Sequence, residues 1–253
     1  MKGVIDMCGI AGFSVARNHK LDARVLSAAL LEQIVTRGYD ATGMAWTDGS
    51  GEVWYKKLDI DAHDFIDTQM DAMDKDAKTV ILHTRWATKG SPMVEENNHP
   101  IIRPGIVGVH NGVITNDDEV FALLDGERLA EVDSEAAFAL IEDGGMEPTE
   151  ALTLLDGRVA LGWIRTEDAN TLHVARWKQS PLAIGQSKMG TFVFASTLPM
   201  LTKAGRKAGL RFTMAQEVAE GWYLKVRNGI IHDTLPIGVP NNVESVLAAM
   251  GAK

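Results

Sequence analysis

The 253-residue sequence has a single cysteine, Cys8, and therefore cannot form a disulfide within the chain. It has no apolar run long enough to span a bilayer, and residues 1–7 lack the apolar core of a secretory signal. Basic residues are outnumbered: 25 Lys and Arg against 34 Asp and Glu give a formal net charge of −9. Proteins that bind nucleic acids usually present a basic surface, which this acidic balance does not favour. These absences predict a soluble cytoplasmic protein that binds neither a membrane nor nucleic acid directly.

The apolar content, 45% of the chain, is sufficient for a sizeable core. Short apolar runs indicate strands over 8–15, 44–46, 52–58, 79–83, 106–114, 158–165, 171–177, 182–185, 192–195, 221–226 and 230–234. Helical spacing indicates helices over 21–35, 118–124, 134–141, 149–155 and 198–208. We expect the 106–114 strand to be broken at residues 110–112. Because no linker or repeat divides the sequence, we predict one α+β domain whose sheets are covered by helices.

Cys8 lies close to the start of the chain, which makes it a candidate N-terminal nucleophile. A lone cysteine is usually a small buried hydrophobe. If the chain began at Cys8, however, one residue would carry both a thiol and a free α-amine. The amine has a pKa near 7.7–8.0 and could serve as a base for the thiol, whose pKa is near 8.5. That arrangement requires Met7 to be a trimmed initiator, or residues 1–7 to be a removed leader. We expect a form that keeps these residues to be inactive.

Polar stretches follow several expected strands, at residues 37–43, 83–90, 110–112 and 133–135. Each alone is typical of a solvated cap, a turn or a helix N-cap. Together they supply what attack on a carboxamide requires. Asn111 and Gly112 offer a side-chain amide and an accessible backbone N–H for an oxyanion. Arg85 and Asp133 could bind the α-carboxylate and the α-ammonium of an amino acid.

These motifs occur in the order found in class II glutamine amidotransferases. They are Cys8-Gly9-Ile10 with Gly12, Arg37-Gly38-Tyr39-Asp40, His83-Thr84-Arg85-Trp86-Ala87-Thr88, Asn98-His99-Pro100, His110-Asn111-Gly112 and Asp133-Ser134-Glu135. Within that family the chain most resembles the glutaminase domain of the glutamine:fructose-6-phosphate amidotransferases, from Cys8 to about Thr234.

The resemblance implies an N-terminal-nucleophile fold, with two antiparallel sheets between helical layers. It implies Cys8 as the nucleophile and Asn111 with Gly112 as the oxyanion hole. Arg85 and Asp133 would hold the charges of L-glutamine, and Trp86 and Thr88 would line the pocket. Arg37 would support the nucleophile loop, and neither a metal nor an organic cofactor is implied. Three histidines, at positions 83, 99 and 110, lack tight metal-ligand spacing, so we interpret them as hydrogen-bonding scaffold.

The chain departs from the family pattern in several places. We divide it into a leader over 1–7, an amidotransferase domain over 8–235 and a tail over 236–253, with a short helix near 243–250. The tail has no room for an acceptor domain, which predicts either that ammonia passes to a separate synthase subunit or that the protein works alone as a glutaminase. Ala41-Thr42 and Lys89 replace the family's serine-alanine pair and histidine.

Two other functions stay open at this point. The chain could hydrolyse another γ-glutamyl amide with the same nucleophile. It could also be a catalytically silent binding module if residues 1–7 are retained. Neither the oligomeric state nor the ammonia acceptor follows from the sequence.

Overall fold

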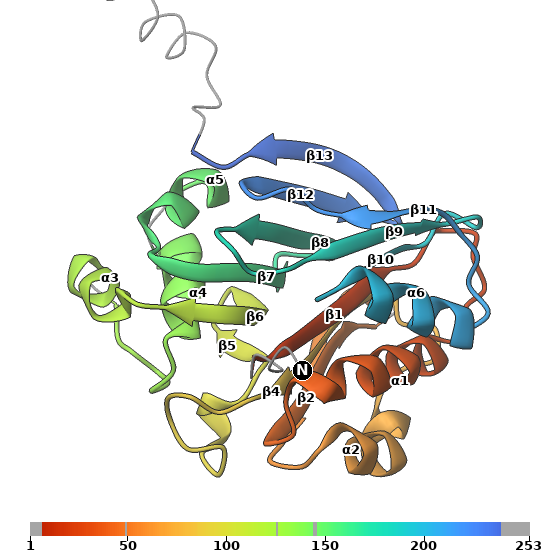
Figure 1. Ribbon diagram of the computed structural model, residues 1–253, viewed down its shortest axis with the longest axis horizontal. Helices are drawn as coiled ribbons and strands as arrows, with labels where there is room; N and C mark the ends of the chain where they lie inside the picture. Colours follow the sequence, from red (N-terminus) through yellow and green to blue (C-terminus); the bar gives the residue numbers. More distant parts are fainter. Residues whose placement is uncertain (1–6, 49, 125, 144–145, 239–253) are drawn as a thin grey trace, which may run out of the picture.

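The computed structural model describes residues 7–48, 50–124, 126–143 and 146–238. Within these residues, two antiparallel sheets are stacked between helices (Figure 1). This is the predicted α+β architecture, and its layers run helices, sheet, sheet, helices. The expected leader, apart from Met7, and the expected helix near 243–250 lie outside the described residues.

The first sheet has seven strands in the order β11-β9-β10-β1-β4-β2-β3. Their bounds are β1 Gly9–Ser14, β2 Ala41–Thr47, β3 Val53–Leu58, β4 Thr79–Arg85, β9 Ala183–Ser187, β10 Phe192–Ala195 and β11 Phe212–Glu217. Segments far apart in the sequence therefore meet in this sheet, because β1 pairs with both β4 and β10.

The second sheet has six strands in the order β13-β12-β8-β7-β6-β5. Their bounds are β5 Ile101–Arg103, β6 Ile106–Ile114, β7 Gly157–Arg165, β8 Asp168–Trp177, β12 Trp222–Arg227 and β13 Ile230–Pro236. Strand β6 is continuous, so the predicted break at residues 110–112 is wrong. All nine of its residues pair with β7, from Ile106 opposite Arg165 to Ile114 opposite Gly157.

Helices cover the outer face of each sheet. Those packed on the first sheet are α1 Ala23–Ile34, α2 Ala62–Gln69 and α6 Leu198–Lys207. Those beside the second sheet are α3 Asp117–Leu123, α4 Ser134–Asp143 and α5 Pro148–Ala151. Short 3₁₀ turns occupy η1 Val35–Arg37, η2 Met70–Ala72, η3 Glu95–Asn97 and η4 Leu152–Leu154. None of the helices in the described residues is long and apolar enough to cross a membrane.

Strand alternation sorts the core into three apolar layers. In β4, Val80 and Leu82 pack among the helices of the first sheet, whereas Ile81 packs between the two sheets. In β6, Val107 and Val109 also pack between the sheets. The third layer lies between the second sheet and its helices. Since successive side chains of a strand point to opposite faces, this alternation also decides where the polar ends of β4 and β6 point.

Candidate active site around Cys8

The candidate site forms where β1, β4 and β6 end. In β4, His83 and Arg85 lie two and four residues after Ile81, and in β6 Asn111 lies two residues after Val109. Residues at this spacing point to the same face of a strand. All three side chains therefore face the space between the sheets. A hydrogen bond across this space joins His83 Nε2 to the carbonyl of His110 at 3.1 Å. Polar residues far apart in the sequence thus converge at one end of the inter-sheet layer.

Cys8 immediately precedes β1 and is held on both sides. The register that pairs Gly9 with Thr84 brings Cys8 next to the end of β4. The Trp86 N–H donates to Cys8 Sγ at 3.4 Å, and Sγ lies 3.6 Å from the Trp86 carbonyl, to which it can donate. Arg37 Nε donates to the Cys8 carbonyl at 2.8 Å. These bonds fix the cysteine backbone, and Arg37 makes the kind of contact that its predicted supporting role needs.

The Cys8 thiol is protonated in this environment. Burial raises the pKa of Cys8 to about 11, although the Trp86 hydrogen bond and the positive charge of Arg85 partly oppose that effect. A pKa of 11 leaves about one thiolate in 10⁴ at pH 7. The thiol therefore needs a base close to it. The Cys8 nitrogen cannot act as that base while Met7 is attached, because it is then an amide.

A small cavity of about 20 Å³ lies against Cys8. We call it the Cys8 cavity, and it is lined by Cys8, Arg85, Trp86, Thr88, Lys89, His99, His110, Gly112, Val132, Asp133 and Ser134. Of the eight predicted site residues, only Arg37 and Asn111 are absent from this lining. A volume of this size holds about one water molecule. Residues over the cavity must therefore move before a molecule as large as an amino acid can enter.

Asn111 and Gly112 have the properties expected of oxyanion donors. Asn111 is fully buried, yet neither its Nδ2 nor its Oδ1 has a hydrogen-bond partner. Buried polar atoms rarely lack partners, so an orphaned amide beside a cavity indicates a position for a ligand. Gly112 has a φ of 153°, and a Cβ there would lie 1.7 Å from the Arg158 carbonyl of β7. Only glycine fits this close approach of two strands.

Arg85 and Asp133 lie on the cavity but are already engaged. The two terminal nitrogens of Arg85 donate to Asn98 Oδ1 and to the carbonyls of Lys89 and Gly90, at 2.7–2.8 Å. Asp133 Oδ2 accepts from the Ile114 N–H at 2.6 Å. These bonds use three of the five N–H groups of Arg85, so a carboxylate could accept from the others or could replace the loop carbonyls. The predicted role of Arg85 as carboxylate ligand stays a prediction.

Sequence reasoning assigned no role to several residues that shape this loop. Asp40 Oδ2 accepts from the Ala87 N–H at 2.7 Å, and Asn98 holds Arg85. Lys89 Nζ pairs with Asp117 Oδ2 at 2.5 Å, and Arg128 pairs with the same oxygen at 3.0 Å. The motifs containing Asp40 and Asn98 signalled that these residues belong near the site. No sequence signal pointed to the contact between Lys89 and Asp117.

Three buried histidines lie behind the cavity. His110 Nε2 faces the Arg158 carbonyl at 3.3 Å and must donate to it, so Nδ1 accepts from Ser134 Oγ at 2.8 Å. His83 stacks on His99 with ring centroids 3.9 Å apart. Burial lowers the pKa of all three rings, to about 3 for His83, so they are neutral at pH 7. The described residues contain no group of three or more His, Cys, Asp or Glu side chains suited to a metal ion.

Comparison with known proteins agrees with this geometry. Residues 83–203 match the model of the glutamine amidotransferase domain family. The glutamine–fructose-6-phosphate aminotransferase (isomerizing) of Staphylococcus aureus is 35% identical over 210 residues, which cover 77% of this chain. Its counterpart from Bacillus subtilis is 34% identical over 207 residues. The chain contains a class II glutamine amidotransferase domain. The matched region includes the end of β4, all of β6 and most of the residues that line the Cys8 cavity.

Solved structures show the same fold for this amidotransferase domain. Glutamine phosphoribosylpyrophosphate amidotransferase from B. subtilis superposes with a TM-score of 0.74 at 22% identity, over 92% of this chain and 50% of that one. A glutamine aminotransferase class-II domain protein from Silicibacter pomeroyi gives a TM-score of 0.59 at 15% identity, over 92% and 100%. The predicted N-terminal-nucleophile sandwich is therefore confirmed. The chain spans about one third of the length of its curated relatives.

Proposed function

We propose that this domain hydrolyses the side-chain amide of L-glutamine to glutamate and ammonia, with Cys8 as the nucleophile. The observation that carries the proposal is the Cys8 cavity, on which a thiol, a guanidinium and a carboxylate meet beside the orphaned amide of Asn111. A free amino acid has the matching groups: an electrophilic carbonyl, an α-carboxylate and an α-ammonium. The order of motifs and the match to the amidotransferase domain family support the same reading.

The reaction proceeds in two balanced steps. Cys8 Sγ attacks the amide carbon while its proton moves, through a water, to the α-amine of Cys8. The Asn111 amide and the Gly112 N–H donate to the oxyanion that forms. The proton then passes to the leaving nitrogen, the C–N bond breaks, and ammonia departs from a thioester. Water attacks the thioester, the C–S bond breaks, and glutamate leaves with the thiol restored.

Access to the cavity depends on the loop over residues 86–92. Arg85 donates to two carbonyls of this loop, those of Lys89 and Gly90. The Lys89 side chain also ties the loop to Asp117 at the start of α3. We propose that glutamine enters when these bonds open, that its α-carboxylate then takes the place of the loop carbonyls on Arg85, and that Asp133 receives the ammonium. Trp86 and Thr88 move with the loop and close over the substrate. We call the ion pair between Lys89 and Asp117 the latch, because it holds the loop over the cavity. Lys89 stands where the family has a histidine.

The destination of the ammonia is a further part of the proposal. The curated relatives are three times as long as the matched portion, and their printed name couples glutamine to fructose 6-phosphate. We propose that this domain delivers ammonia in the cytoplasm to a synthase on a separate subunit. Chemical cross-linking in cells, followed by mass spectrometry, tests this: a recurrent synthase partner is expected, and free accumulation of ammonia without one would contradict it.

An ammonia-release assay with inhibitor labelling tests the hydrolysis itself. Chain that begins at Cys8 is incubated with L-glutamine, γ-glutamyl peptides, L-asparagine and D-glutamine, and separately with 6-diazo-5-oxonorleucine. We expect ammonia from L-glutamine and a single adduct on Cys8 in the peptide map. If a γ-glutamyl peptide released ammonia or was hydrolysed faster than L-glutamine, the substrate would be that peptide and not glutamine. Absence of both turnover and adduct would indicate a silent binding module and overturn the proposal.

A further inference from the structure

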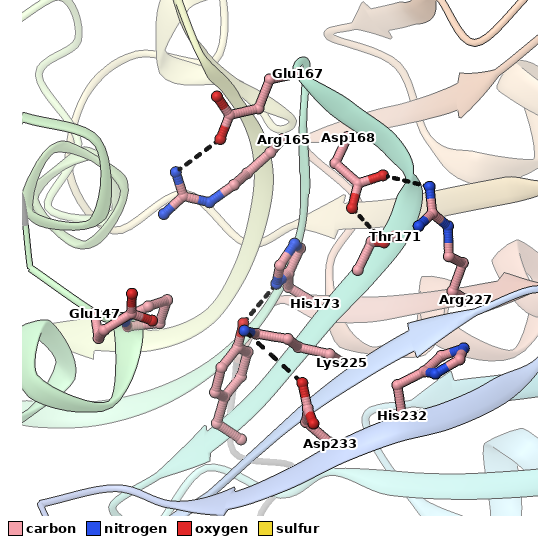
Figure 2. A pocket seen from close by; sticks show the side chains of 12 residues that line it. Glu147, Arg165, Glu167, Asp168, Thr171, His173, Lys225, Arg227, His232 and Asp233 are labelled. Carbon is pink, nitrogen blue, oxygen red and sulfur yellow. Dashed lines mark hydrogen bonds and ion pairs between the residues drawn. The ribbon is translucent and has the colours of Figure 1, made fainter. Parts of the chain in front are cut away.

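A second hollow lies on the outer face of the second sheet, away from Cys8. Its volume is about 460 Å³, which is within the range of small-molecule sites. The floor is formed by β8, β12 and β13, and the walls by the β7–β8 hairpin and the start of α5 (Figure 2). We call it the His173 hollow. It adjoins the Arg165 end of β7, whereas the Arg158 end of the same strand adjoins the Cys8 cavity.

One buried donor in this hollow lacks a partner. His173 is only 5% exposed, and its Nδ1 lies 2.6 Å from the Tyr223 hydroxyl. Tyr223 is 1% exposed and its hydroxyl forms no other printed bond in the described residues, so we assign it as the donor to Nδ1, which places the hydrogen of the neutral ring on Nε2. Nε2 is buried and has no hydrogen-bond partner. A polar N–H left unpaired in this way is costly unless a ligand or a water accepts from it.

The ring is also fixed in place. It stacks on Trp163 with centroids 5.0 Å apart and an interplanar angle of 12°. The bond to Tyr223 removes the remaining rotation. Figure 2 shows His173 in the middle of the hollow, between Arg165 on one side and Lys225 on the other. The orphaned N–H is therefore a preorganised donor and not a mobile surface group.

The two cations that flank His173 are only loosely paired with carboxylates. Arg165 Nη1 lies 3.6 Å from Glu167, and Lys225 Nζ lies 3.9 Å from Asp233, whose side chains are 77% and 48% exposed. Such exposed pairs contribute little and are readily exchanged. Arg165 Nη2 also donates to the Ile141 carbonyl at 3.3 Å. Both cations nevertheless lie near enough to the ring to lower the pKa of His173, after the larger effect of burial. A neutral donor between two available cations suits an oxyanion.

We propose that the His173 hollow binds a small polar organic anion, whose carboxylate or phosphate oxygens accept from His173 Nε2 and pair with Arg165 and Lys225. Glu147, on the opposite wall in Figure 2, would face the uncharged or cationic part of the same ligand. The whole lining has four carboxylates, of Glu147, Glu167, Asp168 and Asp233, against three cations, of Arg165, Lys225 and Arg227, which disfavours polyanions. The site uses none of the groups around Cys8, so it does not depend on the proposed glutaminase activity.

Titration of the chain followed by NMR tests the proposal. Inorganic phosphate and succinate serve as probes, with potassium chloride at matched ionic strength as the control, and side-chain ¹H–¹⁵N signals of histidine are observed. We expect a saturable shift of the His173 Nε2–H signal with at least one probe. Saturation by phosphate alone would assign a phosphate ligand, and saturation by succinate alone a carboxylate ligand.

Matched variants complete this test. Arg165→Met and Lys225→Met keep the His173–Tyr223 pair and should each weaken probe binding about tenfold. Lys203→Met removes an exposed cation on α6, on the other sheet, and should leave the affinity unchanged. His173→Phe keeps the aromatic stack but lacks the observed signal, so its affinity for the probes is measured by isothermal titration calorimetry, and binding should be abolished. Shifts that never saturate, or that are equal in all variants and in chloride, would overturn the proposal.

Discussion

The Cys8 cavity and the His173 hollow adjoin opposite ends of β7 and differ in almost every physical property. The cavity has a volume of about 20 Å³, while the hollow has a volume of about 460 Å³. Around the cavity, five buried polar atoms of Asn111, His83 and His99 lack partners, whereas one atom of His173 does so in the hollow. A small polar cavity suits chemistry that must exclude water, and a large charged hollow suits reversible binding. Volume alone therefore does not point to the proposed site of the reaction.

The largest difference between the two regions should appear in turnover. Replacing the nucleophile, Cys8→Ala, should lower glutaminase activity at least about 10³-fold, because no other group can form the thioester. His173→Phe should change the activity less than about twofold, since the hollow supplies nothing to the chemical step. Ammonia release by the two variants measures both effects. A large loss of activity in His173→Phe would mean that the two regions are coupled.

The orphaned amide gives the next largest effect. Asn111→Ala should lower kcat about 10²–10³-fold, the usual effect of removing one oxyanion donor. The free energy of unfolding of Asn111→Ala should differ little from that of the parent, because neither polar atom of the Asn111 side chain forms a hydrogen bond in the fold. Steady-state kinetics and urea unfolding measure the two quantities.

Asn116 provides the matched control for that prediction. Its amide is fully used, donating to the Leu154 carbonyl and accepting from the Asp156 N–H, both at 2.8 Å. Asn116→Ala should therefore cost about 1 kcal/mol per lost hydrogen bond and leave kcat unchanged. If Asn111→Ala were kinetically silent, the oxyanion assignment would have to be abandoned.

The buried histidines should reveal themselves through pH. Burial lowers the pKa of His83 and of His173 to about 3, below the value near 6.5 of an unfolded histidine. Between these values the unfolded chain binds a proton that the folded ring does not. The free energy of unfolding therefore falls as the pH drops below 6.5, by about 1.4 kcal/mol per pH unit for each ring.

Replacing either ring should remove its share of that slope. His83→Gln and His173→Gln are compared with the parent protein by urea unfolding from about pH 7 to about pH 5, a range above most carboxylate titration. Equal reductions are expected, because both rings are buried although they lie in different regions. A slope that persists unchanged in His173→Gln would show that the ring binds protons equally well in the folded and the unfolded chain, contrary to the lowered pKa of His173.

The latch over the Cys8 cavity should give the smallest effect. Lys89 is 45% exposed in its pair with Asp117, so the pair contributes only about 0.5–1 kcal/mol. Lys89→Met should therefore lower KM for glutamine about 2–5-fold, because the loop opens more readily, and should leave the thioester chemistry intact. Lys89→Arg should restore the parent KM. An unchanged KM in Lys89→Met at low ionic strength would remove the latch from the account.

The sequence predicted the parts of the fold that follow from periodicity. Strands such as β1 and β7 and helices such as α1 and α6 lie close to the predicted bounds. The predictions missed β5, which has only three residues, and β11, a half-exposed edge strand with a register shift between Phe212 and Met214. Short or irregular strands carry too few alternating apolar residues to be recognised.

The site could be predicted where a motif carried it. Cys8, Arg85, Gly112 and Asp133 do line one cavity. The continuity of β6 was missed, because glycine at position 112 signalled a turn when it in fact admits the Arg158 carbonyl. Contacts between segments distant in sequence, such as Lys89 with Asp117, depend on the folded loop and leave no local pattern. The small volume of the cavity depends on the same folded loop, so it could not be predicted from the sequence either.

Comparing two forms of the chain tests the central claim most directly. One form keeps residues 1–7 and the other begins at Cys8, with both N-termini verified by mass spectrometry and both assayed for ammonia release from L-glutamine. We predict turnover only in the form that begins at Cys8, since only its nitrogen can accept the thiol proton. Equal turnover in the form that keeps residues 1–7 would contradict the assignment of the Cys8 α-amine as the base.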